Sequence, residues 1–334
     1  MSKLGLAVIG TGPGSIPHFK SLRDLADIVD VRWVAARRAD SLAAVTDYPT
    51  TTDVAAAIAD PAVNAVLVLT PPSSHLAIAR LAFAGGKHVL VEKPLEVSTD
   101  AARALVAEGR AAGVRLGVVL QHRFRDAGVA MRDLLVSGRL GEIQAASVAV
   151  PWWRPQSYYD EPGRGTQARD GGGVLLTQAI HTLNMFQSLV GVRAVVAAQV
   201  RTTALHRMET EDYASALLEL GNGAPGSLLA TTALYPGRAE SIEIIGTNGT
   251  ARLEGASLRA AFLDGSKLEH ISTEGTGGGA NIMDFPHDAH RAVIADFVAA
   301  VEEGRDPRVT GEDALATQEL IEAILAKGKE ALLF

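Results

Sequence analysis

One lysine and one histidine stand where the sequence could support proton transfer. In VLVEKPLEVS (89–98), an apolar run ends in Glu92 and Lys93, and the proline after Lys93 fixes the next φ angle. In GGGVLLTQAIHTLN, residues Thr177, His181 and Asn184 recur at the i, i+4 and i+7 spacing of one helix face. Lysine and histidine side chains both act as general acids and bases in enzymes. Lys93 and His181 are therefore the catalytic candidates.

The helix predicted around His181 is mostly apolar and carries this one polar stripe. A buried polar group without a partner costs about 1–3 kcal/mol. The stripe must therefore meet protein partners, water or a ligand. A single histidine in such a helix is often a core residue with satisfied hydrogen bonds, but Lys93 and a cofactor loop in the same chain favour the active site.

A glycine-rich loop near the N-terminus has the spacing of a dinucleotide-binding motif. In LAVIGTGPGSIPHFKSL, a G-x-G-x-x-small pattern joins an apolar run to a helical segment. Glycine allows a tight turn and a close approach of the backbone to a pyrophosphate at the positive end of the helix. The residues assigned to the cofactor here are Gly10, Gly12, Pro13, Gly14 and Ser15.

The end of the second predicted strand carries two arginines. A carboxylate normally binds the adenosine ribose at this place, but WVAARRADS offers Arg37 and Arg38. Guanidinium groups suit a 2′-phosphate through charge-assisted hydrogen bonds. The pair favours NADP over NAD, and a solvated arginine pair is the alternative.

Alternating apolar runs and alanine-rich helical segments predict the fold of the first part of the chain. The expected strands are Leu4–Ile9, 29–36, 63–69, His88–Val91 and 115–120, and the expected helices are Val54–Ala59, 76–84 and 101–112. This order predicts a Rossmann-type α/β domain with a doubly wound parallel sheet over residues 1–122. Gln121 and Arg123 follow its last strand, where ligands bind.

The pattern changes to consecutive strands after about residue 140. The segments EIQAASVAV, YASALLEL, GSLLATTALY and SIEIIG read as strands, with hairpin turns at 221–223 and 247–249. We expect an α+β domain with antiparallel pairing over residues 123–334. Helices are expected at 287–303 and 311–331, the last able to pack on the first domain, and a flexible loop at 275–281.

Three segments together carry a resemblance to a known family. TPPSSH (70–75), EKP (92–94) and GGGVLLTQAIHTLN (171–184) look like the Gfo/Idh/MocA oxidoreductases, and the likeness extends to the terminal IADFVAAVEEGRDPRVTGEDAL. The resemblance implies a Rossmann domain followed by a domain with a large, mostly antiparallel open sheet. It also implies an NAD(P)-dependent activity on CH–OH groups, and homodimers or homotetramers formed through the open sheet.

The resemblance further implies roles for individual residues. Thr70, Pro71 and His75 would line the nicotinamide side of the cofactor site. Lys93 would be catalytic, with Glu92 beside it near the cofactor and a cis peptide bond before the proline of the EKP motif.

The helix of His181 departs from the common pattern of that family. Thr177 stands where an aspartate is usual, and Asn184 stands where another acid is frequent. The loss of two negative charges favours Lys93 over His181 as the proton-transferring group. The pair Thr177-Gln178 resembles a subgroup acting at the C3 position of sugars, which includes nucleotide-sugar 3-dehydrogenases and deoxysugar 3-ketoreductases.

The expected chemistry is hydride transfer coupled to proton transfer. Lysine with its usual pKa of about 10.4 is a poor base near neutral pH. Desolvation and a positive nicotinamide ring would both lower the pKa of Lys93. His181 could share the proton or orient the hydroxyl group of the substrate.

The segment WWRPQSYYDEPGRGTQARD gathers aromatic and arginine side chains. Aromatic faces stack on sugars or flat rings, and arginines bind carboxylates or phosphates. A subunit contact is the alternative, since both residue types are enriched at interfaces. The residues assigned to substrate binding are Arg123, Trp152, Trp153, Arg154, Tyr158, Arg164, Thr177, Gln178 and Asn184.

Three functions remain open from the sequence. The first is an oxidoreductase acting on a secondary alcohol or ketone of a sugar, a nucleotide sugar or a cyclic polyol. The second is a dehydrogenase of a non-sugar ring diol, such as a dihydrodiol of an aromatic acid. The third is a cofactor-binding regulator without turnover.

The composition narrows the cellular setting. The net charge of −7 disfavours nucleic acid as a partner, and the chain has no cysteine and no apolar run as long as a membrane span. A cytoplasmic protein is therefore expected. His287 and His290 have a spacing that imitates a metal pair, but without supporting acids we expect no metal, a solvated His287 and an interdomain contact for His290.

Overall fold

The chain divides into two compact units. The computed structural model describes residues 3–272 and 286–330, so the expected loop at 275–281 lies outside the described residues. Unit 1 comprises Met1–Gln121 and His287–Leu315, and unit 2 comprises His122–Pro286 and Ala316–Phe334.

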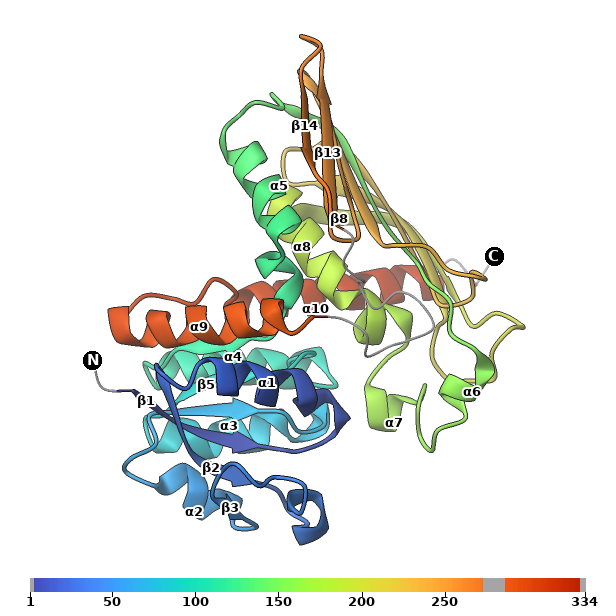
Figure 1. Ribbon diagram of the computed structural model, residues 1–334. Helices are drawn as coiled ribbons and strands as arrows, with labels where there is room; N and C mark the ends of the chain where they lie inside the picture. The colour runs from blue at the N-terminus through green and yellow to red at the C-terminus, as the bar shows by residue number, and fades with distance from the viewer. Residues whose placement is uncertain (1–2, 273–285, 331–334) are drawn as a thin grey trace. The chain divides into compact units, whose positions relative to one another are not determined.

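Unit 1 is built on a six-stranded parallel sheet in the order β3-β2-β1-β4-β5-β6 (Figure 1). The strands are β1 (Leu4–Ile9), β2 (Val29–Ala35), β3 (Thr50–Thr51), β4 (Ala65–Val68), β5 (His88–Val91) and β6 (Leu116–Val118). β1 and β4 are buried along their whole length, because helices cover both faces of such a sheet. The five predicted strands are confirmed, while the two-residue edge strand β3 was not predicted.

The helices of unit 1 begin and end close to the predicted residues. They are α1 (Ile16–Asp24), α2 (Val54–Ala59), α3 (His75–Ala84), α4 (Thr99–Ala111), α9 (Asp288–Glu303) and the first turn of α10 (Gly311–Glu330), with short 3₁₀ turns at Pro13–Ser15, Ala39–Leu42 and Pro72–Ser74. Ser98 accepts a hydrogen bond from the backbone N–H of Ala101 and caps α4. α1 packs against α9, and α3 packs against α4.

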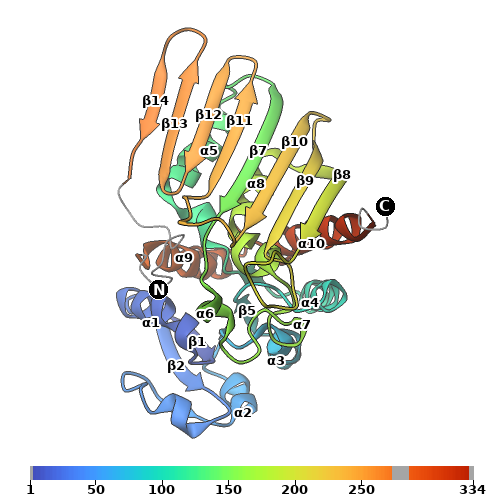
Figure 2. The ribbon, with the colours of Figure 1, turned by 90° about the vertical axis from the view of Figure 1, so that its right-hand side faces the viewer.

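Unit 2 is built on an eight-stranded, mostly antiparallel sheet in the order β14-β13-β12-β11-β7-β10-β9-β8 (Figure 2). The strands are β7 (Ile143–Pro151), β8 (Val192–Arg201), β9 (Tyr213–Leu220), β10 (Pro225–Thr231), β11 (Ser241–Gly246), β12 (Gly249–Glu254), β13 (Ser257–Phe262) and β14 (Lys267–His270). β7 and β10 pair in parallel, the exception in this sheet. The predicted hairpins β9–β10 and β11–β12 are confirmed as antiparallel pairs.

One face of this sheet is covered by helices and the other is open. α5 (Asp126–Val136) and α8 (Ile180–Val190) pack on the covered face (Figure 1). Burial alternates along β9, where Ala216 and Leu218 are buried and Leu217 is exposed. The open face predicted for the second domain is therefore present.

Short helices and one irregular segment complete unit 2. They are α6 (Gln156–Tyr159), α7 (Gln167–Asp170) and a π-helical segment at Leu175–Ala179 that leads into α8, and a 3₁₀ turn at Gln121–Phe124 joins β6 to α5. α10 continues into unit 2 after its first turn. Among the described residues, none of the helices combines the length and hydropathy required to cross a membrane.

Candidate active site

The glycine loop after β1 leaves its backbone open in front of α1. Gly10 has a φ of +110°, and a Cβ there would lie 2.8 Å from the carbonyl carbon of Leu69. A Cβ on Gly12 or Gly14 would meet nothing within 4 Å. Ser15 closes the turn, because its backbone N–H and its hydroxyl both donate to the carbonyl oxygen of Gly12, at 2.8 and 2.7 Å. The exposed backbone at the start of a helix fits the pyrophosphate of a dinucleotide.

Arg37 and Arg38 lie exposed in the bend that follows β2. The carbonyl oxygen of Arg38 accepts a hydrogen bond from the hydroxyl of Ser41, at 2.7 Å. Thr11 in the glycine loop donates its hydroxyl to the carbonyl oxygen of Ser41, at 2.8 Å. These two bonds tie the arginine bend to the glycine loop within unit 1.

His75 connects two loops at the carboxyl ends of β4 and β5. Its Nε2 lies 2.8 Å from the carbonyl oxygen of Thr70. Its Nδ1 lies 3.1 Å from the carbonyl oxygens of Pro94 and Leu95. The ring is fully buried, whereas Thr70 is partly exposed and Pro71 is exposed. The structure thus places His75 beneath these two loops, which it holds together, and its assignment to the nicotinamide side of the cofactor site stays a prediction.

The segment that carries Lys93 is held firmly at the end of β5. The Lys93–Pro94 peptide bond is cis, as the resemblance implied. The backbone N–H of Glu92 donates to the carbonyl oxygen of Val68, at 2.9 Å, which continues the pairing with β4. Glu92 Oε2 accepts the backbone N–H of Lys93, also at 2.9 Å, and Leu95 is buried. Lys93 itself is half-buried. The hydrogen bonds of Glu92 hold the backbone from which its side chain extends.

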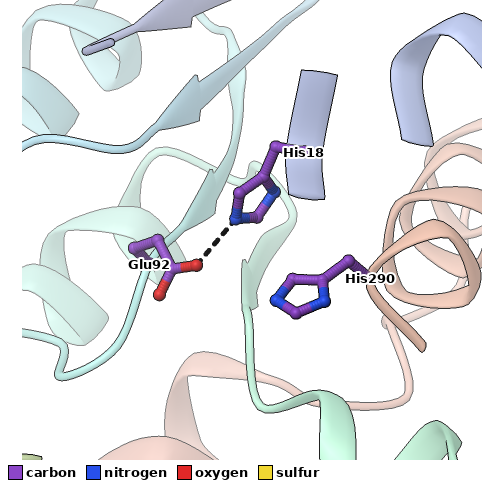
Figure 3. Close-up of side chains that lie close together, drawn as sticks. All are labelled: His18, Glu92 and His290. Atoms are coloured by element: carbon purple, nitrogen blue, oxygen red, sulfur yellow. Dashed lines mark hydrogen bonds and ion pairs between the residues drawn. The ribbon is translucent and has the colours of Figure 1, made fainter. Parts of the chain in front are cut away.

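Glu92 is surrounded by two histidines that the sequence did not link to it. His18 Nε2 from α1 lies 2.7 Å from Glu92 Oε1, and His290 from α9 lies beside both (Figure 3). Burial by itself raises the pKa of Glu92, but the hydrogen bond from His18 and the charges of His18, His290 and Lys93 lower this pKa to about 2. Glu92 is therefore a carboxylate at any ordinary pH.

The same three side chains form a group with metal-ligand chemistry. Their ligand atoms lie within 4.8 Å of one another, and two imidazoles with one carboxylate suit a divalent transition metal. The sequence predicted an interdomain contact for His290, whereas α9 belongs to unit 1 and the imidazole is buried against His18. His287 lies at the start of α9 and contacts Asp24 at 2.7 Å, with part of its side chain exposed.

In unit 2, the helix of His181 begins with a π-helical turn. The predicted α-helical spacing is therefore wrong between Thr177 and His181, because the wider turn rotates the two side chains relative to each other. The Thr177 hydroxyl donates to the carbonyl oxygen of Gly173, at 2.7 Å. π-helical turns occur frequently at functional sites.

His181 stacks on His122, a residue that sequence reasoning did not single out. The ring centroids are 5.0 Å apart and the ring planes are inclined by 27°. His122 is buried in the 3₁₀ turn after β6, in the same QHRFR segment as Gln121 and Arg123, which are partly exposed. The stack fixes the orientation of the His181 imidazole within unit 2.

Asn184 is not exposed on α8. Its side chain is buried, and Nδ2 donates to the hydroxyl of Thr317 on α10, at 3.0 Å. The predicted substrate contact through Asn184 is replaced by this link between α8 and α10.

The aromatic and arginine side chains cluster around Tyr158. The guanidinium of Arg164 lies 4.1 Å from the centroid of the Tyr158 ring, and that of Arg154 lies 5.8 Å from it. Gln178 Nε2 is 3.5 Å from the Tyr158 hydroxyl, which joins this cluster to the helix of His181. Burial lowers the pKa of Arg154, an effect that the charge of Arg164 reinforces. Two guanidinium groups beside the Tyr158 ring give this cluster a positive charge.

The two tryptophans take different places beside this cluster. Trp152 is buried, and the guanidinium of Arg154 lies 5.2 Å from its ring. Trp153 is partly exposed and packs edge-on against Tyr235 at a centroid distance of 5.5 Å. Trp152 therefore packs inside the cluster, and Trp153 lies at its surface.

Two acidic residues that support this part of unit 2 gave no signal in the sequence. Glu211 accepts the backbone N–H groups of Gly173 and Leu175, both at 3.1 Å, and so caps the start of the His181 helix. Asp212 binds Nδ1 of His206 at 2.7 Å, and both side chains are fully buried beneath the aromatic cluster. Both acids precede β9; Glu211 lies 38 and 36 residues from Gly173 and Leu175, whereas Asp212 lies 6 residues from His206.

Comparisons with known proteins give one consistent family. Residues 4–120 match the model of the oxidoreductase family with an NAD-binding Rossmann fold, and residues 129–252 match the GFO/IDH/MocA C-terminal domain. The chain is 28% identical to 1,5-anhydro-D-fructose reductase of Ensifer adhaerens over 288 residues, 84% of this chain and 83% of the relative. It is 24% identical to inositol 2-dehydrogenase of Rhizobium meliloti over 328 residues, 95% and 94% of the two chains.

A solved structure has the same fold over nearly the full length. The WlbA dehydrogenase of Bordetella pertussis, crystallised with NADH and UDP-GlcNAcA, superposes with a TM-score of 0.83 at 26% identity, covering 99% of this chain and 98% of that one. With its parallel-sheet unit, its open antiparallel sheet and both domain models matched, the chain belongs to the Gfo/Idh/MocA family of NAD-binding oxidoreductases.

Proposed function

We propose that the protein moves a hydride between a nicotinamide cofactor and a secondary alcohol or ketone of a sugar, a nucleotide sugar or a cyclic polyol. The observation that carries this proposal is the fixed Lys93 segment. A lysine on a braced backbone at the carboxyl end of a parallel strand stands where such sheets bind their ligands. The family match supplies the reaction class.

The residues of the chain then take distinct parts in the reaction. The glycine loop and the arginine bend would hold the dinucleotide, and its nicotinamide ring would supply the hydride acceptor or donor. In the oxidation direction Lys93 Nζ removes the hydroxyl proton as the C–H hydride leaves, and in reduction it returns the proton to the carbonyl oxygen. His181, held by its stack on His122, is the second candidate for this proton exchange.

The cluster around Tyr158 supports a polar ring as the substrate. Arg154 and Arg164 would bind hydroxyl or acidic groups, and the Tyr158 ring would pack on a flat face of the substrate. The named relatives act on an anhydrofructose and an inositol, and the solved neighbour holds a nucleotide sugar acid. A ring diol of aromatic origin is the second candidate, because the same aromatic and guanidinium faces would stack on it.

We also propose NADP as the preferred cofactor and a homodimer or homotetramer as the assembly. Arg37 and Arg38 support NADP, since both are exposed beside the glycine loop and, among described residues, neither guanidinium has an acidic partner. The NADH in the solved neighbour makes NAD the competing choice. The open face of the sheet in unit 2 supports the assembly.

The test is a dehydrogenase screen with the Lys93→Met variant. Sugars, sugar acids, nucleotide sugars, inositols and an aromatic dihydrodiol are offered with NAD and NADP, and absorbance at 340 nm is followed. We expect turnover with at least one carbohydrate ring. Lys93→Met should lose at least about a thousandfold in kcat, because both proton removal and its orientation disappear, and should still bind cofactor in a fluorescence titration.

Lys267→Met is the matched control, because Lys267 is an exposed lysine on β14. It should retain wild-type turnover. Wild-type turnover by Lys93→Met would remove the role assigned to Lys93. Activity with the dihydrodiol alone would select the second candidate.

A further inference from the structure

A buried histidine beneath the aromatic cluster of unit 2 has no part in the proposed chemistry. His206 lies between β8 and β9, and its side chain is fully buried, as is that of Asp212. Nδ1 of His206 lies 2.7 Å from Asp212 Oδ2, and Nε2 lies 2.8 Å from the carbonyl oxygen of Arg154. All three residues belong to unit 2.

Both ring nitrogens of His206 face oxygens that accept hydrogen bonds. The carbonyl oxygen of Arg154 can only accept. The carboxyl group of Asp212 also accepts the backbone N–H of Thr203 on Oδ1, at 2.8 Å, and the Thr203 hydroxyl on Oδ2, at 2.6 Å. An ionised carboxylate accepts all three bonds at once, whereas an imidazole with a single N–H donates to one partner. The geometry therefore calls for a hydrogen on both ring nitrogens, in a buried pair whose two charges neutralise each other.

Aromatic side chains enclose this imidazole. The ring centroid of Tyr159 lies 4.8 Å from that of His206, and the ring centroid of Trp153 lies 5.9 Å from it. The Tyr159 hydroxyl bonds to the hydroxyl of Thr232 at 2.7 Å, and burial raises the pKa of Tyr159 to about 12, so this residue is a neutral phenol. Asp212 is therefore the anion that faces the imidazole.

The backbone of Arg154 is held on both sides. Its N–H donates to the carbonyl oxygen of Thr232, at 2.9 Å, and its carbonyl oxygen faces His206. The carbonyl oxygen of Asp212 accepts the N–H of Thr232, at 3.0 Å, so the same acid supports both contacts. The guanidinium of Arg154 lies 5.8 Å from the ring centroid of Tyr158. His206 thus fixes the backbone from which the Arg154 side chain reaches the Tyr158 cluster.

The residue before Asp212 holds the other candidate segment of unit 2. Glu211 caps the start of the His181 helix through two backbone N–H groups. Asp212 follows directly and holds His206. Two consecutive residues at the entry to β9 therefore fasten the aromatic cluster and the His181 helix to one sheet.

We propose that His206 is a positioning residue for substrate binding: it donates from both ring nitrogens, to Asp212 and to the carbonyl group of Arg154, and so fixes Arg154 beside Tyr158. The effect on substrate rests on the proposed function, whereas the double donation by His206 does not. Loss of the bond to Arg154 weakens the binding of the polar ring. The hydride step and the cofactor, which do not touch this cluster, stay almost unchanged.

The first measurement requires no substrate. Long-range ¹H–¹⁵N NMR spectra of the labelled full chain show which ring nitrogens of its nine histidines carry a hydrogen. The signals of His206 are identified by their loss in His206→Gln. We expect a hydrogen on both nitrogens near neutral pH, and in Asp212→Asn we expect Nδ1 to lose it. A single N–H on His206 in the wild-type chain would overturn the proposal, whether or not the substrate screen finds turnover.

Two variants of His206 keep one donor each. The side-chain amide of glutamine reaches the position of Nε2, and that of asparagine reaches the position of Nδ1. His206→Gln should therefore keep the bond to Arg154, and His206→Asn should keep only the bond to Asp212. We expect His206→Asn to raise the KM of the substrate about tenfold and His206→Gln to raise it less than about threefold, with kcat and the KM of the cofactor within about twofold in both.

The same two variants are compared without substrate. The Nε–H signal of Arg154, assigned by its loss in Arg154→Lys, reports how rigidly the side chain is held. Its heteronuclear NOE should stay high in the wild-type chain and in His206→Gln, and should fall in His206→Asn. If the substrate screen finds no turnover, the proposed function fails, and this comparison still decides whether His206 positions Arg154.

A purely structural role would not separate the two variants. Both leave part of a buried hydrogen-bond network unfilled, so both should lower Tm. His270→Asn is the matched control, because it makes the same change in a partly exposed histidine on the edge strand β14, and it should leave Tm, KM and the Arg154 signal as in the wild type. Equal KM values and equal mobility of Arg154 in His206→Gln and His206→Asn would overturn the proposal.

Discussion

The arginine bend after β2 is the place where we expect single side chains to decide between NADP and NAD. Arg37 and Arg38 are exposed next to a loop that fits a pyrophosphate. Hydrogen bonds from a guanidinium to a phosphate contribute about 1.5–3 kcal/mol each, and about 1.4 kcal/mol corresponds to a tenfold change in affinity. We expect the double variant Arg37→Asp, Arg38→Ser to bind NADP at least about tenfold more weakly and NAD about as before.

Fluorescence titration of both dinucleotides checks this expectation. Arg32→Ser serves as the control, because Arg32 lies on β2 and pairs with Asp30 at 2.8 Å, so its loss removes a nearby positive charge without changing the bend. If the double variant lost affinity for NAD and NADP equally, Arg37 and Arg38 would not bind the 2′-phosphate of the ribose.

Residue chemistry could be predicted where it is local in the chain. Glu92 and Lys93 are neighbours, so an apolar strand followed by EKP was enough to single them out. His18 and His290 lie 74 and 198 residues from Glu92, and only the packing of α1 and α9 on the sheet brings them together. The buried position of His75 depends on the carbonyl groups of Thr70, Pro94 and Leu95, which a sequence does not position.

The start of the His181 helix is the element that positions the candidate residues Thr177 and His181 within unit 2. Glu211 is in contact with Gly173. A Cβ on this glycine would lie 1.9 Å from the carbonyl oxygen of Glu211 and 2.6 Å from its Oε2. The backbone must shift to make room, at a cost of about 1–3 kcal/mol. We expect Gly173→Ala to lose that much stability and to lower kcat, since the helix carrying Thr177 and His181 would move.

Urea unfolding and steady-state kinetics measure the two effects. Gly172→Ala is the neighbouring control, because the nearest atom to its Cβ would be Leu176 Cβ at 3.1 Å, a far milder contact than the 1.9 Å at Gly173. Equal losses in the two variants would mean that the cap by Glu211 has no special role at this turn.

The elements themselves were predicted well where the hydrophobic pattern is simple. β1 and β5 agree residue for residue, because continuous apolar runs between turn signals mark buried parallel strands. β8 was not predicted, since most of its residues are exposed or partly exposed and give neither a run nor a regular alternation. The π-helical turn was also missed, because the sequence around it reads as an ordinary α-helix.

At the scale of the whole molecule, the return of the chain to unit 1 is set by tertiary packing. The pattern of residues 287–303 predicts a helix but does not say which sheet it covers. In the structure Phe297 of α9 is buried, and a Cβ on Gly117 in β6 would lie 2.9 Å from its ring. A small residue on the strand and a large one on the helix therefore make the fit, and such complementarity is visible only once both elements are placed.

We expect identical chains to assemble through the open face of the sheet in unit 2. Across the paired strands β9, β10 and β7, the outward residues Leu217, Ser227 and Ser147 lie in one row. Leu217 is 57% exposed although it lies on an inner strand. An exposed leucine in the middle of an open sheet face is a candidate interface position, and a second copy of this face is the partner we propose.

Light scattering after size exclusion at micromolar concentration measures the assembly. We expect the wild-type chain to elute as a dimer or tetramer and Leu217→Asp to dissociate, because the charge would be buried without a partner. Leu263→Asp is the control, since Leu263 is 83% exposed in the turn after β13, outside the row on the open face, and should leave the assembly intact. A monomeric wild-type chain, or dissociation caused equally by Leu263→Asp, would contradict an interface centred on this face.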